Sequence, residues 1–155
     1  MRPFARMTIL PTLTLLSMMP VGSPVTWSFS STSAADGSVL IELTAQCEEG
    51  WHIYATELPS NEGPIATSFR FTPSEAYRMI GALREPEPEE QYDPNFAMTV
   101  LSHSGAPRFA LNVMPRTHEP FVVDGQVEFM VCNDRTCLPP VVVPFSITVT
   151  PAKTK

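Results

Sequence analysis

A chain of 155 residues, 43% of them hydrophobic, is long enough for one domain with a core of its own. The formal net charge of −6 argues against a basic surface for nucleic acid, so nucleic acid is not an expected partner. The 17 prolines leave little room for long helices, because proline removes a backbone donor and clashes inside a helix. The composition therefore favours a domain built from strands.

Residues 1–23 have the organisation of a secretory signal peptide. Arg2 and Arg6 give a positive start, and residues 8–19 form an apolar run. This run is shorter than the roughly 20 residues that a membrane-spanning helix needs. We therefore expect cleavage near Ser23 and a mature protein that does not span the membrane; an uncleaved anchor or a buried strand is the alternative. Export would permit disulfide bonds.

Alternation with period two recurs along the rest of the chain and predicts half-buried strands. In residues 39–47 the apolar side chains and Cys47 share one face, so Cys47 is expected to be a buried core residue. Other strands are expected near residues 25–29, 51–54, 67–71, 77–83, 96–102, 108–114, 121–131 and 141–149. Turn signals lie between them, and Asp124-Gly125 is a further one. This pattern predicts an all-β, two-layer antiparallel sandwich.

The strand at residues 51–54 carries a histidine. If Trp51 and Ile53 face the core, His52 and Tyr54 lie on the opposite face, where a lone histidine is usually solvated. The histidines of the chain lack the spacing of metal ligands, and no phosphate loop or nucleophile elbow occurs. The sequence therefore predicts no cofactor and no metal centre.

Residues 84–94 are rich in proline and acidic residues. The prolines favour an extended path without regular pairing, so we expect a solvated acidic loop with Tyr92 as its exposed aromatic residue. Loops of this kind carry function more often than strands do.

Cys132 and Cys137 flank a short polar stretch between two strand-like runs. Asn133-Asp134 supplies turn chemistry, which predicts a hairpin in which the cysteines face each other closely enough to bond. Closing so short a loop is worth only about 2 kcal/mol, so the bond would be a weak staple. A redox-active pair near the surface is the favoured interpretation, and a structural bridge is the alternative.

Two motifs carry a resemblance to a known family. Cys137-Leu138-Pro139-Pro140 and Gly50-Trp51-His52-Ile53-Tyr54 are similar to motifs of the amino-terminal periplasmic domain of DsbD-type thiol:disulfide interchange proteins. The resemblance covers nearly all of residues 24–151 and leaves residues 152–155 as a tail. It implies an immunoglobulin-like sandwich with a redox-active cysteine hairpin and a flexible cap loop.

The resemblance also implies roles for particular residues. Cys137 would form the mixed disulfide with partners, and Cys132 would resolve it. His52 and Tyr54 would lie beside the pair. The cap would lie in residues 89–93, with Tyr92 as the shielding aromatic next to Glu90 and Gln91.

The family implies a periplasmic electron relay. A membrane-embedded thiol reductant would supply electrons, and oxidised periplasmic thioredoxin-like proteins would receive them for disulfide isomerisation and cytochrome c maturation. Two departures stand out: the cysteines are one residue closer together than in the best-known members, and we expect neither a membrane domain nor a thioredoxin domain, since these 155 residues contain no pattern for either. A separate electron donor is therefore expected.

Two rival functions stay open at this stage. One is a non-catalytic immunoglobulin-like binding module whose hairpin disulfide is structural. The other is a periplasmic metal-handling domain that would use Cys132, Cys137 and His52 with the nearby Met130.

Overall fold

The computed structural model describes residues 22–153, and in this range every regular element is a strand. Nearly all of the predicted signal peptide, residues 1–23, lies outside the described residues, as does the end of the predicted tail. Within them there is no helix that could cross a membrane. The strands are β1 (Val25–Ser33), β2 (Val39–Cys47), β3 (His52–Tyr54), β4 (Ser68–Phe71), β5 (Tyr77–Arg84), β6 (Glu89–Asp93), β7 (Met98–Ser104), β8 (Arg108–Pro115), β9 (Phe121–Phe129), β10 (Val131–Cys132) and β11 (Val141–Val149).

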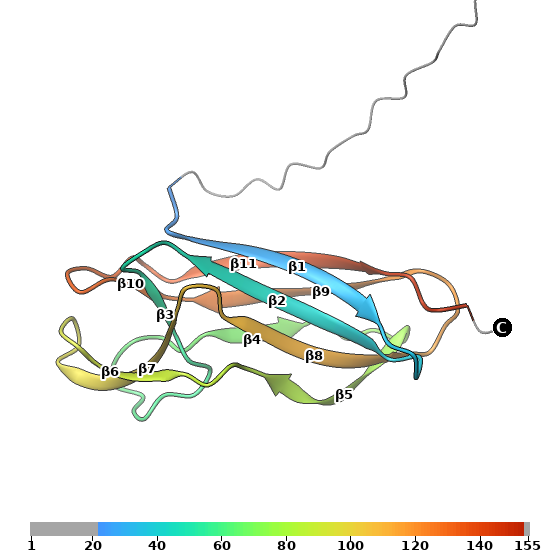
Figure 1. Ribbon diagram of the computed structural model, residues 1–155, viewed down its shortest axis with the longest axis horizontal. Coiled ribbons are helices and arrows are strands. Elements are labelled where there is room, and N and C mark those ends of the chain that lie inside the picture. Colours follow the sequence, from blue (N-terminus) through green and yellow to red (C-terminus); the bar gives the residue numbers. More distant parts are fainter. Residues whose placement is uncertain (1–21, 154–155) are drawn as a thin grey trace, which may run out of the picture.

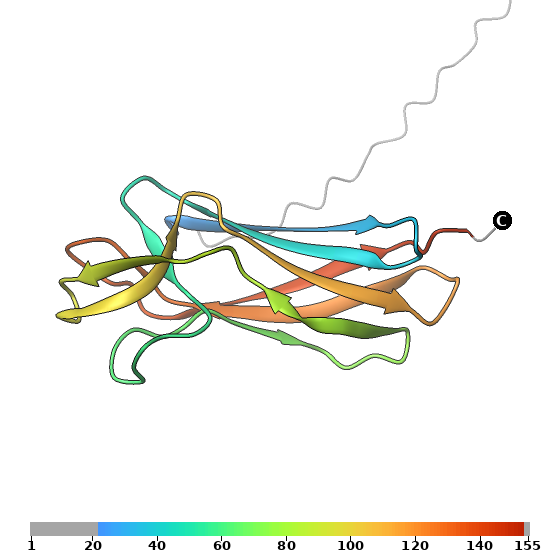
Figure 2. The ribbon, with the colours of Figure 1, turned by 60° about the horizontal axis from the view of Figure 1, so that its bottom comes forward.

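Three antiparallel sheets are formed, with strand orders β1-β2-β8-β5, β11-β9-β4 and β10-β3-β7-β6. The first two sheets pack face to face as a sandwich (Figures 1 and 2). The third sheet has shorter strands, is called here the small sheet and lies at one end of the sandwich; the residues that follow β11 lie at the other end (Figure 1). The predicted all-β, immunoglobulin-like antiparallel sandwich is therefore confirmed.

The sandwich core follows from the period-two pattern. Along β2 every second residue is buried, including Cys47 at 5% exposure, as predicted. The buried Trp27 of β1 joins the two layers. Its indole contacts aromatic rings at centroid distances of 5.6 to 5.9 Å, from Phe69, Phe109 and Phe129. Burying a large apolar side chain of this kind stabilises the fold by about 1.5–3 kcal/mol.

The turn predicted at Asp124-Gly125 is not formed, because both residues lie inside β9. Gly125 is opposite Phe145 of β11 and Phe71 of β4, whose rings meet at 5.4 Å. A Cβ at residue 125 would lie 2.5 Å from the Phe145 ring and 2.6 Å from the carbonyl oxygen of Arg70. Glycine stands here because the strand is crowded, not because the chain turns.

The acidic stretch also differs from its prediction. Residues 89–93 form β6, which pairs with β7 from Glu89 opposite Ser102 to Asp93 opposite Met98. Regular pairing is possible because β6 is an edge strand, and the prolines lie before it and directly after it instead of inside it. The predicted path without regular pairing is found at residues 85–88, before β6, and a turn at residues 94–97 follows β6.

Candidate active site

The two cysteines lie where the chain passes from the sandwich into the small sheet. β9 ends at Phe129, Met130 interrupts the strand, and β10 then pairs with β3 instead of continuing the β9 ladder. The single strand predicted for residues 121–131 is therefore divided between two sheets. This change of sheet carries Cys132 to the end of the sandwich (Figure 1).

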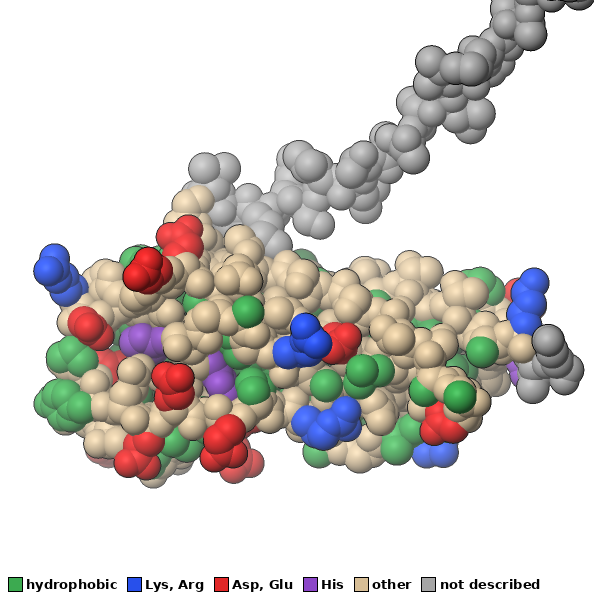
Figure 3. All heavy atoms as spheres, viewed as in Figure 1, with side chains coloured by type: hydrophobic (Ala, Val, Ile, Leu, Met, Phe, Trp, Pro, Cys, Tyr) green, Lys and Arg blue, Asp and Glu red, His purple; other side chains and the backbone are tan. Residues whose placement is uncertain are grey.

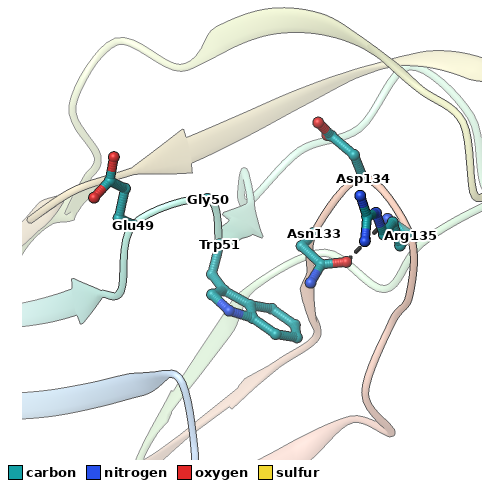
Figure 4. A pocket seen from close by; sticks show the side chains of 6 residues that line it. All are labelled: Glu49, Gly50, Trp51, Asn133, Asp134 and Arg135. Atoms are coloured by element: carbon teal, nitrogen blue, oxygen red, sulfur yellow. Dashed lines mark hydrogen bonds between the residues drawn. The ribbon is translucent and has the colours of Figure 1, made fainter.

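Residues 132–137 form a tight loop, called here the cysteine loop. Asn133 donates its backbone N–H to the carbonyl of Thr136 at 2.9 Å. The side-chain oxygen of Asn133 accepts hydrogen bonds from the backbone N–H groups of Arg135 and Thr136, each at 2.9 Å (Figure 4). The turn chemistry predicted at Asn133 is confirmed.

The two cysteine residues differ in exposure. Cys132 and Cys137 are bridge partners and form a disulfide. The side chain of Cys132 is fully buried, whereas Cys137 is partly exposed. Another molecule can therefore reach Cys137 more readily than Cys132.

The disulfide belongs to an apolar cluster separate from the sandwich core. Its buried members are Tyr54, Val100 and Cys132, and the partly buried Leu58, Phe96, Met98, Met130 and Cys137 pack against them. Thioether side chains fill irregular space and adapt to rearrangement. This cluster can therefore adjust when the sulfurs part.

Tyr54 joins Cys137 to a buried carboxylate. Its hydroxyl donates a hydrogen bond to Oδ2 of Asp93 at 2.5 Å and lies 4.0 Å from the sulfur of Cys137. Burial, together with this bond to the Asp93 carboxylate, raises the pKa of Tyr54, so it stays protonated. Burial acts to raise the pKa of Asp93, but hydrogen bonds from Tyr54 and Asn95 together lower it. Asp93 is therefore a charged group beneath the disulfide.

His52 is 7% exposed, so its predicted solvated position is wrong. Its face of β3 is covered, because β6 brings Asp93 across it. Nε2 of His52 lies 3.7 Å from Oδ2 of Asp93 and has no hydrogen-bond partner among the described residues. Burial lowers the pKa of His52, although the Asp93 charge acts to raise it.

The turn at residues 94–97 contacts both the cysteine loop and the apolar cluster. The side-chain amide of Asn95 donates to the backbone carbonyl of Asn133 at 2.8 Å. The ring of Phe96 packs edge-on against Tyr54, with centroids 6.2 Å apart. No sequence signal distinguished Asn95, Phe96 or Asp93; their roles depend on contacts between distant segments.

The residues predicted for the cap lie on β6. Tyr92 is 64% exposed, and it alternates with Asp93, which points inward. Glu90 is exposed, and Gln91 donates to the hydroxyl of Ser102 at 2.7 Å. Phe96, in the turn after β6, packs against the disulfide cluster. The shielding role of Tyr92 stays a prediction.

A half-buried carboxylate holds the start of this segment. The Glu85 carboxylate accepts hydrogen bonds from Thr56, through its backbone at 3.0 Å and its hydroxyl at 2.7 Å, and lies 3.1 Å from Nε2 of His103. Burial acts to raise the pKa of Glu85, but these bonds lower it below its ordinary value. Glu85 therefore anchors the chain just before β6.

The surface around the cysteine loop is acidic. Figure 3 shows acidic side chains gathered over the end of the molecule that carries β6 and β10. A pocket of about 270 Å³ lies between the turn before β3 and the cysteine loop (Figure 4). Its lining residues are Glu49, Gly50, Trp51, Asn133, Asp134 and Arg135.

The described residues outside the disulfide site lack the features of a metal site and of a reactive thiol. Among residues 22–153, no three His, Cys, Asp or Glu side chains gather in the way that a metal ion requires. Cys47 is a free, buried cysteine, and burial raises the pKa of its thiol to about 11. Nothing in the described residues therefore supports the metal-handling rival.

The fold and site define an immunoglobulin-like sandwich domain with a disulfide held at one end. Residues 23–148 match the family described as thiol:disulfide interchange protein DsbD, N-terminal. The chain belongs to this family of DsbD amino-terminal domains. No curated protein sequence matches it significantly.

Three solved structures have a similar fold. The N-terminal periplasmic domain of ScsB from Proteus mirabilis is 16% identical with a TM-score of 0.59; the match covers 85% of this chain and 48% of that one, about half its length. The reduced DsbD N-terminal domain of Neisseria meningitidis is 17% identical with a TM-score of 0.52, over 87% of this chain and 96% of that one. The same domain in a complex with the PilB N-terminal domain, also from Neisseria meningitidis, is 15% identical with a TM-score of 0.52, over 89% and 96%.

Proposed function

We propose that this protein is a periplasmic thiol-disulfide exchange protein. Its Cys132–Cys137 pair accepts electrons from a membrane-embedded thiol reductant and passes them to oxidised thioredoxin-like proteins. The unequal exposure of the two cysteine residues carries the proposal, because exchange needs one cysteine that a partner can reach and one whose sulfur can leave. Family membership supports the same chemistry.

Reduction of the pair proceeds through a mixed disulfide. A reductant thiolate attacks the sulfur of Cys137, the Cys132–Cys137 bond breaks, and Cys132 leaves as a thiolate. The second cysteine of the reductant, as a thiolate, then attacks the reductant sulfur that is bonded to Cys137, and Cys137 is released. The reductant becomes a disulfide, and the domain takes up two electrons and two protons.

Client reduction runs the same steps in reverse. The Cys137 thiolate attacks a sulfur of the client disulfide, and one client sulfur leaves. Cys132 then attacks Cys137, which restores the domain disulfide and releases the client dithiol. The Tyr54 hydroxyl borders the Cys137 sulfur at 4.0 Å, and its one proton is donated to Asp93.

Partners dock on the end of the sandwich that carries the cysteine loop. The solved complex of a DsbD N-terminal domain with the PilB N-terminal domain supports a protein partner for a domain of this family. In this chain the pocket is lined in part by residues 133–135 of the cysteine loop, which ends at the partly exposed Cys137, so a partner segment flanking its reactive cysteine would contact the domain there. The acidic surface favours partners with basic residues around their disulfide.

We assign the mature domain, residues 24–151, to the periplasm. The signal-peptide pattern of residues 1–23 supports export, and the related Proteus mirabilis domain is described as periplasmic. An oxidising compartment keeps a disulfide of this kind available for exchange.

Trapping of mixed disulfides tests the proposal. Cys132→Ser leaves the reachable sulfur without its resolving partner, so it should form a stable covalent complex with an oxidised thioredoxin-like protein. Cys137→Ser leaves only the buried sulfur and should form little complex. Equal trapping by both variants, or trapping by neither, would contradict the assignment and favour the binding-module alternative.

A further inference from the structure

His52 and the buried Cys132 are neighbours on adjacent strands of the small sheet. In the β10–β3 ladder, Cys132 is opposite His52. Directly opposed residues of an antiparallel pair project from the same face, with Cβ atoms about 4.5–5.5 Å apart. Both side chains are buried, at 0% and 7% exposure. The Cys132 and His52 side chains therefore lie next to each other on the same buried face of the sheet.

The imidazole has an unused nitrogen. Nε2 of His52 has no hydrogen-bond partner among the described residues, and its distance of 3.7 Å from Asp93 is too long for one. The Asp93 carboxylate already accepts bonds from Tyr54 and from the backbone N–H of Asn95. A buried polar atom without a hydrogen-bond partner lowers the stability of the fold. The imidazole nitrogen would regain a partner in a reaction state in which it exchanges a proton with a neighbouring group.

We propose that His52 is the proton-transfer partner of Cys132 during thiol-disulfide exchange. This inference rests on the proposed function and assigns one of its steps. While Cys137 is bonded to a client, the neutral imidazole takes the proton of the Cys132 thiol. The S–H bond breaks, an N–H bond forms, and the Cys132 thiolate attacks the sulfur of Cys137.

The proton balance closes in both directions. In client reduction the client sulfur leaves as a thiolate and takes its proton from the imidazolium or from water. When the domain itself is reduced, Cys132 leaves as a thiolate and takes up a proton from water, which the imidazole passes on by gaining one proton at a ring nitrogen and then giving it to the sulfur. No electron passes through His52, so it changes the rate of the Cys132 step and not the overall stoichiometry.

The charged groups facing His52 fit this role. Asp93 reaches it from β6, and Asp134 acts on it from the cysteine loop; both carboxylates favour the imidazolium. Tyr54 contacts the ring edge-on at 5.2 Å and stays protonated. Burial outweighs the carboxylates and lowers the pKa, so the imidazole is neutral and able to accept a proton at neutral pH.

A coloured aromatic disulfide separates the two cysteine steps. The reduced domain should release one equivalent of aromatic thiolate when Cys137 attacks, and a second when Cys132 attacks the resulting mixed disulfide. In the wild-type protein the second rate constant should rise with pH and level off once His52 is neutral. A variant lacking both reactive cysteines measures the contribution of Cys47.

His52→Gln and His52→Asn remove the titrating group but keep a polar side chain, and the same change at the exposed His118 is the matched control. We expect the second rate constant at pH 7 to fall by about tenfold or more and its plateau to disappear, with the first changed less than about twofold. An unchanged second rate and pH profile in a folded variant, or an equal fall of both rates, would overturn the inference. If the wild-type protein never releases the second equivalent, the proposed function itself fails.

Discussion

The side chain of Asn95 is hydrogen-bonded to the backbone carbonyl of Asn133 across 38 residues of sequence. This bond ties the turn after β6 to the loop between the two cysteines. Because Asn133 lies in the cysteine loop, we expect a partner that reacts with Cys137 to approach beside this contact. We therefore expect the bond from Asn95 to Asn133 to hold the turn in place and to slow the approach of other molecules to the disulfide.

Asn95→Ala should loosen this restraint. The side-chain bond to Asn133 is lost, whereas the backbone bond from Asn95 to Asp93 at 2.8 Å is kept. We expect the disulfide to be reduced by a small phosphine about threefold to tenfold faster, which corresponds to the roughly 1 kcal/mol of one such hydrogen bond. Asn61→Ala, in an exposed loop, is the control, and an equal rate in both variants would contradict the restraint.

Alkylation of the reduced pair compares the two aromatic residues near the turn. Phe96→Ala should speed alkylation of Cys137, because the ring belongs to the apolar cluster around the sulfurs. Tyr92→Ala should do so only if the exposed Tyr92 acts as the shield that the family resemblance implies. Mass spectrometry of alkylated protein over time measures both rates. A faster rate in the Tyr92 variant alone would move the shielding role back to Tyr92.

Tyr54→Phe should destabilise the fold. The Tyr54 hydroxyl donates to the charged, buried Asp93, and a hydrogen bond to a charged group is worth about 1.5–3 kcal/mol. Tyr77→Phe is a matched control, because its hydroxyl donates to a neutral backbone carbonyl, that of Thr72, at 3.3 Å. Urea unfolding should therefore show a larger loss of unfolding free energy for Tyr54→Phe. Equal losses would mean that the Asp93 bond is of ordinary strength.

Stability should fall in acid through two separate groups. The folded pKa of His52 is below its ordinary value of 6.5, so the unfolded state binds more protons and stability declines as pH falls through 6.5. The folded pKa of Asp93 is below 3.8, so its contribution is lost only at lower pH, through the folded value. Urea unfolding from about pH 7.5 to pH 4.5 should show a slope that His52→Gln flattens and His118→Gln keeps.

Local features of the site could be predicted from the sequence. Asn133 and the spacing of the cysteines determine the cysteine loop through bonds within a few residues. The alternation of apolar and polar residues in β2 likewise predicted that Cys47 lies in the core, because successive side chains of a strand point to opposite faces. Such features depend on neighbours in the chain.

The surroundings of the disulfide could not be predicted in this way. Alternation shows that His52 and Tyr54 share a face of β3, but not that β6 covers this face. Tyr54 and Asp93 are 39 residues apart, and nothing in either segment specifies their hydrogen bond. The change of sheet at Met130 is equally hidden, since the apolar run continues through it.

The reduction potential of the Cys132–Cys137 pair tests the central claim most directly. The mature domain would be equilibrated in graded thiol buffers, and its alkylated cysteines counted by mass. We expect a midpoint between about −200 and −270 mV, in the range of proteins that exchange disulfides with partners. A midpoint below about −300 mV would show that the bond is structural, and would contradict a role in electron transfer.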